Sequence, residues 1–160
     1  MALTEQERKL AKIIKDPVLW AEHTLKDPNT LNKPLKLRWP QIKVLRDPST
    51  KVVMRFGRRI GKTIALAVKM LHYAFTHANS VQILATPYES QIKVVFDQLS
   101  GFIYSSPQLK DSIKGSTKNP WEIVFKNGAR IKGFTAGTRS GAEGGSLRGQ
   151  KADIIYLDEK

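Results

Sequence analysis

The stretch at residues 55–67, "RFGRRIGKTIALA", constrains the fold of this chain more than any other. Residues 61–63, Gly-Lys-Thr, match the end of a phosphate-binding loop, which usually has the pattern G-x-x-x-x-G-K-[ST]. The position of the first glycine holds Phe56, and Gly57 comes one residue late. Such a loop needs a helix directly after it, because backbone N–H groups at the helix N-terminus surround the phosphate. The stretch therefore predicts a strand, a loop and a helix in succession.

The residues on either side of the loop fit this unit. "KVVMRF", residues 51–56, has the β-branched character of a buried strand. "KTIALAVKMLHYAFTHA", residues 62–78, is apolar at helical spacing. Near the other end of the chain, "ADIIYLDE", residues 152–159, reads as an apolar strand that ends in two acids. The chain thus offers two strands whose ends carry polar groups suited to a nucleotide.

Helix and strand signals also alternate through the rest of the chain. Thr4 and Glu7 form a capping box for a helix that runs to about Lys15, and Asp16-Pro17 begins a second helix. The further elements expected are a loop at 26–36, a helix starting near Pro40, a strand at 80–87, a helix at 89–104, a hairpin at 121–134 around Asn127-Gly128, and a loop at 135–150.

This alternation predicts an α/β fold. We expect a mainly parallel central sheet with helices on both faces, one antiparallel hairpin, and additional helices at the N-terminus. In sheets of this kind, ligands bind at the carboxyl ends of the strands, where the loop in question lies. We divide the chain into an N-terminal helical segment, residues 1–50, and a core, residues 51–160.

The charge of the chain indicates a polyanionic partner. The sequence has 27 Lys and Arg against 14 Asp and Glu, a formal net charge of +13, and the excess is spread along the whole chain. A folded, evenly basic chain favours binding to nucleic acid, although a solvated basic surface would have the same composition. The absence of cysteine excludes disulfides, thiolate metal sites and cysteine nucleophiles. The charged N-terminus does not resemble a secretory signal.

The loop and the acidic strand together predict a nucleotide-hydrolysing site. Gly61 allows close approach of the backbone, Lys62 offers an ammonium to the outer phosphates, and Thr63 offers a hydroxyl to Mg²⁺. Asp158 would lie next to the metal, and Glu159 could polarise the attacking water. If these two acids stood alone, an ordinary buried strand with a polar end would be the better interpretation. With the Gly-Lys-Thr loop, they indicate ATP and Mg²⁺ as cofactors.

Three motifs together resemble one family. "GRRIGKT", "SLRGQKADIIYLDE" and "WPQIKVL" resemble the ATPase domain of the large terminase subunit, the motor that packages DNA into tailed-phage and herpesvirus heads. In that family the first glycine of the loop is commonly displaced and an arginine follows, as Gly57-Arg58 does here. The resemblance covers nearly the whole chain. It implies a P-loop NTPase fold of the ASCE type and a Mg²⁺-dependent ATPase that moves double-stranded DNA into a procapsid.

The resemblance also implies roles for individual residues. Arg58 resembles the loop arginine that senses or contacts the γ-phosphate, and Gln41 resembles a glutamine that contacts adenine. Arg148 resembles an arginine that is proposed to reach into the site of a neighbouring subunit. The residues expected to bind the nucleotide are Gln41, Gly57, Arg58, Arg59, Ile60, Gly61, Lys62 and Thr63; those expected to be catalytic are Glu159, Arg148 and Arg58; those expected to hold the metal are Thr63 and Asp158.

Several of these residues also fit simpler roles. Arg59 fits a solvated or DNA-facing side chain, Gln41 a surface residue on a short helix, and Arg148 a partner for a nearby acid. The three tryptophans fit packing better than base stacking. The three histidines show no ligand spacing or catalytic partner, so we interpret them as structural or surface residues.

The resemblance implies partners and a location as well. These are double-stranded DNA, the portal and small terminase subunit of a procapsid, and further copies of the chain in a ring, with a monomer in isolation. The expected location is the host cytoplasm, transiently at the portal, with no membrane association. The sequence departs from the family in stopping at Lys160. We therefore expect an ATPase core that is incomplete at the C-terminus and no nuclease domain.

Two other functions fit the same motifs. Helicase-like, DNA-dependent ATPases share the loop and the acidic strand, and they would separate strands instead of moving an intact duplex. A truncated domain could instead bind nucleotide or DNA without turnover. Phosphate release from Mg²⁺-ATP, measured with and without duplex DNA, distinguishes turnover from binding alone.

Overall fold

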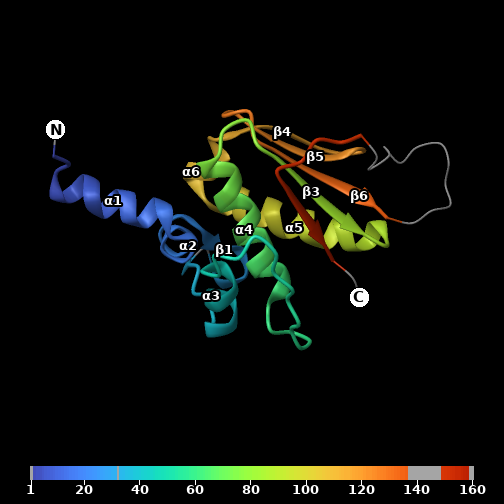
Figure 1. Cartoon of the computed structure of the whole chain (residues 1–160), viewed down its shortest axis with the longest axis horizontal. Coiled ribbons are helices and arrows are strands. Elements are labelled where there is room, and N and C mark those ends of the chain that lie inside the picture. The colour runs from blue at the N-terminus through green and yellow to red at the C-terminus, as the bar shows by residue number, and fades with distance from the viewer. Residues whose placement is uncertain (1, 32, 137–148, 159–160) are drawn as a thin grey trace.

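A five-stranded mixed sheet forms the centre of the computed structural model, which describes residues 2–31, 33–136 and 149–158 (Figure 1). Its strands, in spatial order, are β4 (Ile113–Lys118), β5 (Trp121–Phe125), β6 (Arg130–Thr135), β3 (Val81–Thr86) and β7 (Ile154–Leu157). β3 pairs in parallel with both β6 and β7, whereas β4–β5 and β5–β6 are antiparallel. The fold is α/β as expected, but a mainly parallel sheet is not confirmed, because the hairpin and β4 extend the parallel strands on one side.

The helices precede, connect and cover these strands. They are α1 (Glu5–Lys15), α2 (Pro17–Thr24), α3 (Trp39–Leu45), α4 (Lys62–Thr76), α5 (Glu89–Ser105) and α6 (Pro107–Lys110), with the 3₁₀ helix η1 (Pro28–Thr30). The small antiparallel pair β1 (Lys26–Asp27) and β2 (Lys33–Pro34) lies in the region expected to be a loop. Among the described residues, no helix is long and apolar enough to cross a membrane.

The two long helices, α4 and α5, pack on the same face of the sheet. On β3, the Gln82 amide donates to the Met70 carbonyl of α4. Leu84 lies two residues after Gln82, so its side chain points to the same face of the sheet. It pairs with Gly133 of β6, whose Cα faces Ile92 of α5. The expectation of helices on both faces is therefore not met within the described ranges, where α4 and α5 share one face.

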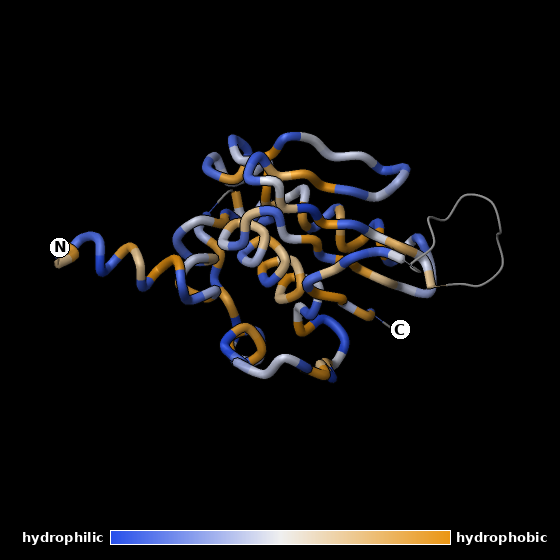
Figure 2. The backbone as a smooth tube through the Cα atoms, turned by 45° about the horizontal axis from the view of Figure 1, so that its top comes forward, coloured by the Kyte–Doolittle hydropathy of each residue, from blue (hydrophilic) through white to orange (hydrophobic). Residues whose placement is uncertain are grey.

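One apolar core joins the N-terminal helices to the sheet. Figure 2 shows apolar residues concentrated along the strands and the central helices. The core contains residues from both sides of position 50, including Val18, Trp20 and Leu25 before it, and Met70, Leu71, Leu99, Ile123 and Ile131 after it. The N-terminal helices α2 and α3 consequently support the helix that follows the loop.

The local signals in the sequence are confirmed by hydrogen bonds. The Thr4 backbone N–H donates to the Glu7 carboxylate at 2.7 Å, and the Glu7 N–H donates to the Thr4 hydroxyl at 3.3 Å, which completes the capping box of α1. Asp16 accepts from the Val18 N–H at 2.9 Å and caps α2. Gly128 has a φ of 85° in the hairpin turn, a conformation that glycine adopts without strain.

The expected strand at residues 51–56 is wrong. These residues form no strand, and Val53 is 96% exposed. A strand requires a neighbour for its backbone groups, and none of the described strands pairs with this segment. The β-branched residues therefore lie in a segment without regular secondary structure that leads from α3 to the loop.

Two further elements were not expected from the sequence. β4 reads "IKGSTK" and lacks alternation, because it is an edge strand of which only Ile113 is partly buried. α6 has only four residues, too few for a helical periodicity. Most of the expected loop at 135–150 lies outside the described residues.

His72 connects α4 to the end of α1, in agreement with a structural role. Its Nε2 lies 2.8 Å from the Ile14 carbonyl oxygen, which accepts when this nitrogen carries the proton, and its ring meets Trp20 edge-on. Burial lowers the pKa of the His72 imidazole, against the smaller opposing effect of the hydrogen bond to Ile14. The folded protein therefore favours the neutral ring.

We expect this preference to make the protein less stable in mild acid. The stabilisation from a neutral His72 is fully present above the ordinary histidine pKa of about 6.5 and is lost as the pH falls below it. The substitution His72→Gln keeps an N–H donor but cannot titrate, so the loss of stability between pH 7.5 and pH 5.5 should become smaller. Urea unfolding at both pH values measures this. An identical pH dependence in the variant would contradict the assignment.

Candidate functional site

The loop before α4 ends in a residue that must be glycine. Gly61 is the N-cap of α4 and has a φ of 90°, a conformation unfavourable for other residues. A Cβ at this position would also overlap the Gln41 side-chain amide. The first N–H groups of α4 have no partner within the helix, and the helix dipole adds positive potential there. The loop thus presents the geometry that binds an anion at a helix N-terminus.

The structure brings the loop lysine against the acid at the end of β7. Lys62 is the first residue of α4, and its ammonium forms an ion pair with the carboxylate of Asp158. Asp158 is held there because its backbone N–H donates to the Ala85 carbonyl at 3.1 Å, one residue beyond the end of β7. The side chains of Lys62 and Asp158 are 29% and 18% exposed. The pair is therefore accessible from solvent, yet held by two regular elements.

Gln41 is buried and linked to the end of the loop. Its Nε2 donates to the Gly61 carbonyl at 3.0 Å, and its Oε1 accepts from the Arg38 backbone N–H at 2.8 Å. It is only 3% exposed, so the alternative of a surface residue on α3 is wrong. Both ends of its amide contact the protein itself. The role of Gln41 as an adenine contact stays a prediction.

The other predicted residues divide into three groups. Arg58 and Arg59 form an exposed turn, in which Arg59 has a φ of 63°. Ile60 and Thr63 are partly buried beside them. Arg148 and Glu159 lie outside the described residues, and their catalytic roles stay predictions.

The oxygen donors at the site suit a hard cation. Thr63 follows Lys62 directly, and Asp158 contacts Lys62, so a hydroxyl and a carboxylate lie at the same end of α4. No group of three or more His, Cys, Asp or Glu that could hold a metal occurs within the described part of the chain. Mg²⁺ commonly uses one or two protein oxygens and keeps several waters, so this donor set fits it.

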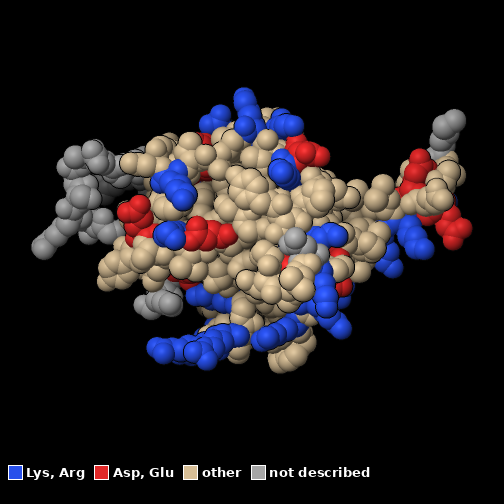
Figure 3. Space-filling view, turned by 180° about the vertical axis from the view of Figure 1, so that it is seen from behind, with Lys and Arg blue, Asp and Glu red and all other residues tan. Residues whose placement is uncertain are grey.

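The surface around the loop is strongly basic. Figure 3 shows Lys and Arg side chains gathered at the end of the molecule where α3 and the loop lie. Residues 43–59 contain one acid, Asp47, and the exposed basic residues Lys43, Arg46, Lys51, Arg55, Arg58 and Arg59. This cluster, which we name the basic strip, raises the positive potential next to the N-terminus of α4.

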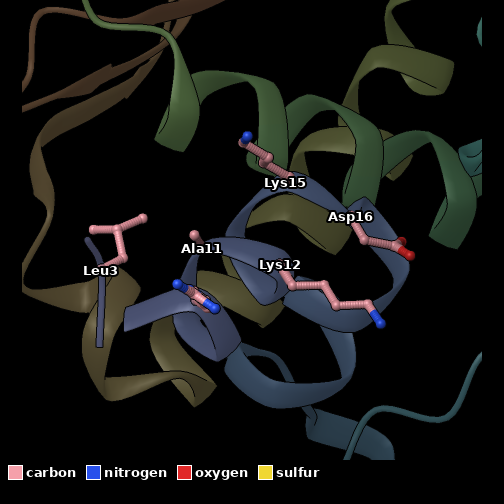
Figure 4. A pocket seen from close by; sticks show the side chains of 6 residues that line it. Leu3, Ala11, Lys12, Lys15 and Asp16 are labelled. Carbon is pink, nitrogen blue, oxygen red and sulfur yellow. The ribbon is translucent and has the colours of Figure 1, made fainter. Parts of the chain in front are cut away.

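Two surface hollows lie away from the loop. One follows α1 and is lined by Leu3, Arg8, Ala11, Lys12, Lys15 and Asp16 (Figure 4). The other lies on β4, β5 and β6, at residues 114–117, 122, 124 and 130. Neither includes a residue of the loop or Asp158. Anion binding by backbone N–H groups at a helix end does not require a deep hollow, so the loop remains the candidate site.

A comparison with family models identifies the relationship of this chain. The model that describes the N-terminal part of the T4-like-virus type of terminase large subunit matches residues 53–160, more than half of the chain. The chain belongs to the terminase large subunit family. The matched region of this terminase contains the loop, Lys62 and Asp158.

A solved terminase has a similar fold. The crystal structure of the HK97 bacteriophage large terminase matches with a TM-score of 0.75 and 17% sequence identity, over 91% of this chain and 31% of the HK97 chain. At this identity the likeness shows the fold alone. The present terminase chain therefore spans about a third of the length of the HK97 protein. No curated protein matches the chain significantly.

One set of buried polar residues near the site was missed from the sequence. Tyr156 of β7 donates to Gln82 of β3, which in turn donates to the Met70 carbonyl of α4. The available signal was a glutamine and a tyrosine within otherwise apolar strands, "VQILAT" and "IIYL". These residues connect the two elements that carry Lys62 and Asp158.

Proposed function

We propose that the loop at residues 57–63 and Asp158 form the ATP site of a DNA-packaging motor. The observation that carries this proposal is the ion pair between Lys62, at the N-terminus of α4, and Asp158, at the end of β7, in a member of the terminase large subunit family. The donor groups expected for phosphate and Mg²⁺ thus lie together. Their placement at the carboxyl end of a parallel strand agrees with the usual position of ligands in such sheets.

Each residue of the site has a role in this proposal. When ATP binds, the Lys62 ammonium leaves the Asp158 carboxylate and contacts the outer phosphates instead. Asp158, together with Thr63, can then bind the cation. Mg²⁺ held by Thr63 and Asp158 would supply positive charge to balance the charge on the phosphates. Glu159 orients the attacking water and accepts its proton. Arg58, exposed in the turn of the loop, contacts the γ-phosphate.

Partners beyond ATP are also part of the proposal. Family membership favours double-stranded DNA, a procapsid portal and a small terminase subunit, with several copies of the chain in a ring. The basic strip supports a polyanionic partner, because its six exposed basic residues outnumber its one acid, Asp47, and only Arg46 among them forms an ion pair with an acid outside the strip, Asp16, in the described part of the chain. Host cytoplasm as the location and Mg²⁺-dependent turnover belong to the same proposal.

The first test is ATP binding and phosphate release, with and without duplex DNA. Mg²⁺-dependent ATP binding together with DNA-stimulated release supports the motor function. Binding without release would indicate a nucleotide-binding domain that does not turn over. A strand-displacement assay separates a helicase, which converts a duplex into single strands, from a packaging motor, which leaves it intact.

DNA binding is expected to be non-specific and to weaken steeply with salt. Contacts between the basic strip and phosphates release counterions, so log K should fall linearly with log salt concentration, by about 0.9 for each phosphate contacted. Replacing both Lys51 and Arg59 with Gln should reduce the magnitude of this slope by about 2. Lys110→Gln in α6, outside the strip, serves as the control. Fluorescence anisotropy with duplexes of unrelated sequence gives both values, and a slope that the double substitution leaves unchanged would place the DNA elsewhere.

A further inference from the structure

A chain of buried hydrogen bonds links the strand that carries Asp158 to the helix that begins at Lys62. The Tyr156 hydroxyl donates to Gln82 Oε1 at 2.8 Å, and Gln82 Nε2 donates to the Met70 carbonyl oxygen at 2.8 Å. Gln82 and Met70 are fully buried, and Tyr156 is 8% exposed. In Figure 1, β3 lies beside β7, with α4 packed against them. The Gln82 side chain on β3 therefore bridges β7 and α4.

The apolar surroundings keep the Tyr156 hydroxyl, the Gln82 amide and the Met70 carbonyl in these hydrogen bonds. A buried amide or hydroxyl that loses its partner destabilises the folded state, so the three groups keep one another in place. Burial raises the pKa of the Tyr156 hydroxyl, which therefore stays a donor at any physiological pH. The bridge is thus directional, whereas the apolar contacts around it are not.

The bridge and the ion pair are two separate connections between the same two elements. Asp158 lies two residues after Tyr156 and so projects from the same face of the sheet. Met70 lies on α4 about 12 Å along the axis from Lys62, at about 1.5 Å per residue. The backbone ladder with β3 sets the register of β7, and the bridge through Gln82 sets how the two strands sit against α4, so both decide where the Asp158 carboxylate meets the end of the helix.

We propose that Tyr156 and Gln82 are positioning residues that hold Asp158 against Lys62. The positioning concerns the protein alone, and its consequence for Mg²⁺-ATP depends on the proposed function. The alternative is that the bridge only satisfies buried polar groups. In that case its removal lowers stability and leaves the interaction between Lys62 and Asp158 as it was.

A double-mutant cycle measures that interaction without any nucleotide. The unfolding free energies of Lys62→Met, Asp158→Asn and the double variant give the coupling between the two side chains. We expect Tyr156→Phe to remove at least half of this coupling. Tyr104→Phe takes the same atom from an exposed tyrosine of α5 and should leave the coupling unchanged. If the coupling in the Tyr156→Phe background equals that of the wild type, the inference is overturned.

A second variant separates positioning from stability. Tyr156→Phe leaves the Gln82 oxygen without its donor, whereas Tyr156→Phe combined with Gln82→Met removes both polar side-chain groups and keeps a similar volume. The Met70 carbonyl then loses its side-chain donor but lies inside α4, where the helix supplies an N–H. The combined variant should recover stability relative to Tyr156→Phe but should not recover the coupling. Recovery of both would assign the bridge a structural role only and would also overturn the inference.

Nucleotide binding then tests the consequence for the site. The probe is ATP, measured by calorimetry with Mg²⁺ and with EDTA. Tyr156→Phe should reduce the Mg²⁺-dependent gain in affinity about fivefold, equivalent to roughly 1 kcal/mol, and leave the affinity in EDTA unchanged. Ile123→Val, in the core of β5, is the control for general destabilisation.

The coupling between Lys62 and Asp158 tests the positioning, and ATP binding tests the proposed function, so either one can be contradicted without the other. A wild-type chain that shows no Mg²⁺-dependent ATP binding, but whose coupling falls in Tyr156→Phe, overturns the proposed function and supports the positioning. An unchanged coupling overturns the positioning, whatever the chain does with ATP.

Discussion

Replacing Lys62 with alanine is expected to abolish measurable ATP binding, with a loss of affinity of roughly 100-fold or more. The substitution removes the ammonium at the N-terminus of α4, and charge-assisted hydrogen bonds contribute about 1.5–3 kcal/mol each. Isothermal calorimetry with Mg²⁺-ATP measures the effect. Lys69→Ala removes a lysine from the same helix about two turns further on and should bind ATP as the wild type does.

The Lys62→Ala measurement tests whether the loop binds the phosphates of ATP. If Lys62→Ala and Lys69→Ala bound ATP with the wild-type affinity, the phosphates would not lie at the N-terminus of α4. The ion pair with Asp158 would then be a structural contact only.

The second large effect is expected at Arg148. Phosphoryl transfer spreads negative charge over the γ-phosphoryl oxygens, and an arginine supplied by a neighbouring subunit accelerates it by roughly 10³–10⁵-fold. Arg148→Ala should therefore keep ATP binding and lose turnover by about 10³-fold or more. Phosphate release measures this in an assembled ring, and calorimetry confirms that the nucleotide still binds.

Mixing two inactive variants tests whether Arg148 acts between subunits. At a mixed interface, the Arg148→Ala subunit still offers an intact Glu159, and the Glu159→Gln subunit still offers its arginine. Some activity should therefore return on mixing. Mixed rings that assemble but do not exceed the sum of the two separate rates would show that Arg148 acts within its own subunit or only in folding.

The parts of the fold that were predicted correctly depend on local chemistry. The Thr4 and Glu7 capping box, Asp16 at the start of α2 and the turn at Gly128 each need only neighbouring residues. The long helix after the loop follows from apolar residues at helical spacing. The two motifs predicted that Lys62 and Asp158 belong to one site, because a phosphate loop and an acidic strand imply each other, but their direct ion pair was not predicted.

The parts that were missed depend on which segments become neighbours. Residues 51–56 have strand composition, but composition does not supply a pairing partner. β4 is an edge strand with little burial, so it carries no alternation from which it could be found. The bridge from Tyr156 to Gln82 joins residues far apart in the chain, and only the parallel pairing of β7 with β3 brings them together.

The hydrogen bond from Gln41 to the Gly61 carbonyl restrains one end of the loop more than the other. The downstream end is tied to the buried face of α3 and begins α4, so it cannot shift without breaking contacts on both sides. The upstream end, Gly57 to Arg59, is exposed. If a phosphate group binds at the loop, we therefore expect residues 57–60 to rearrange while Gly61 and α4 keep their positions. Hydrogen exchange on ATP binding should accordingly slow first at Arg58 and Arg59.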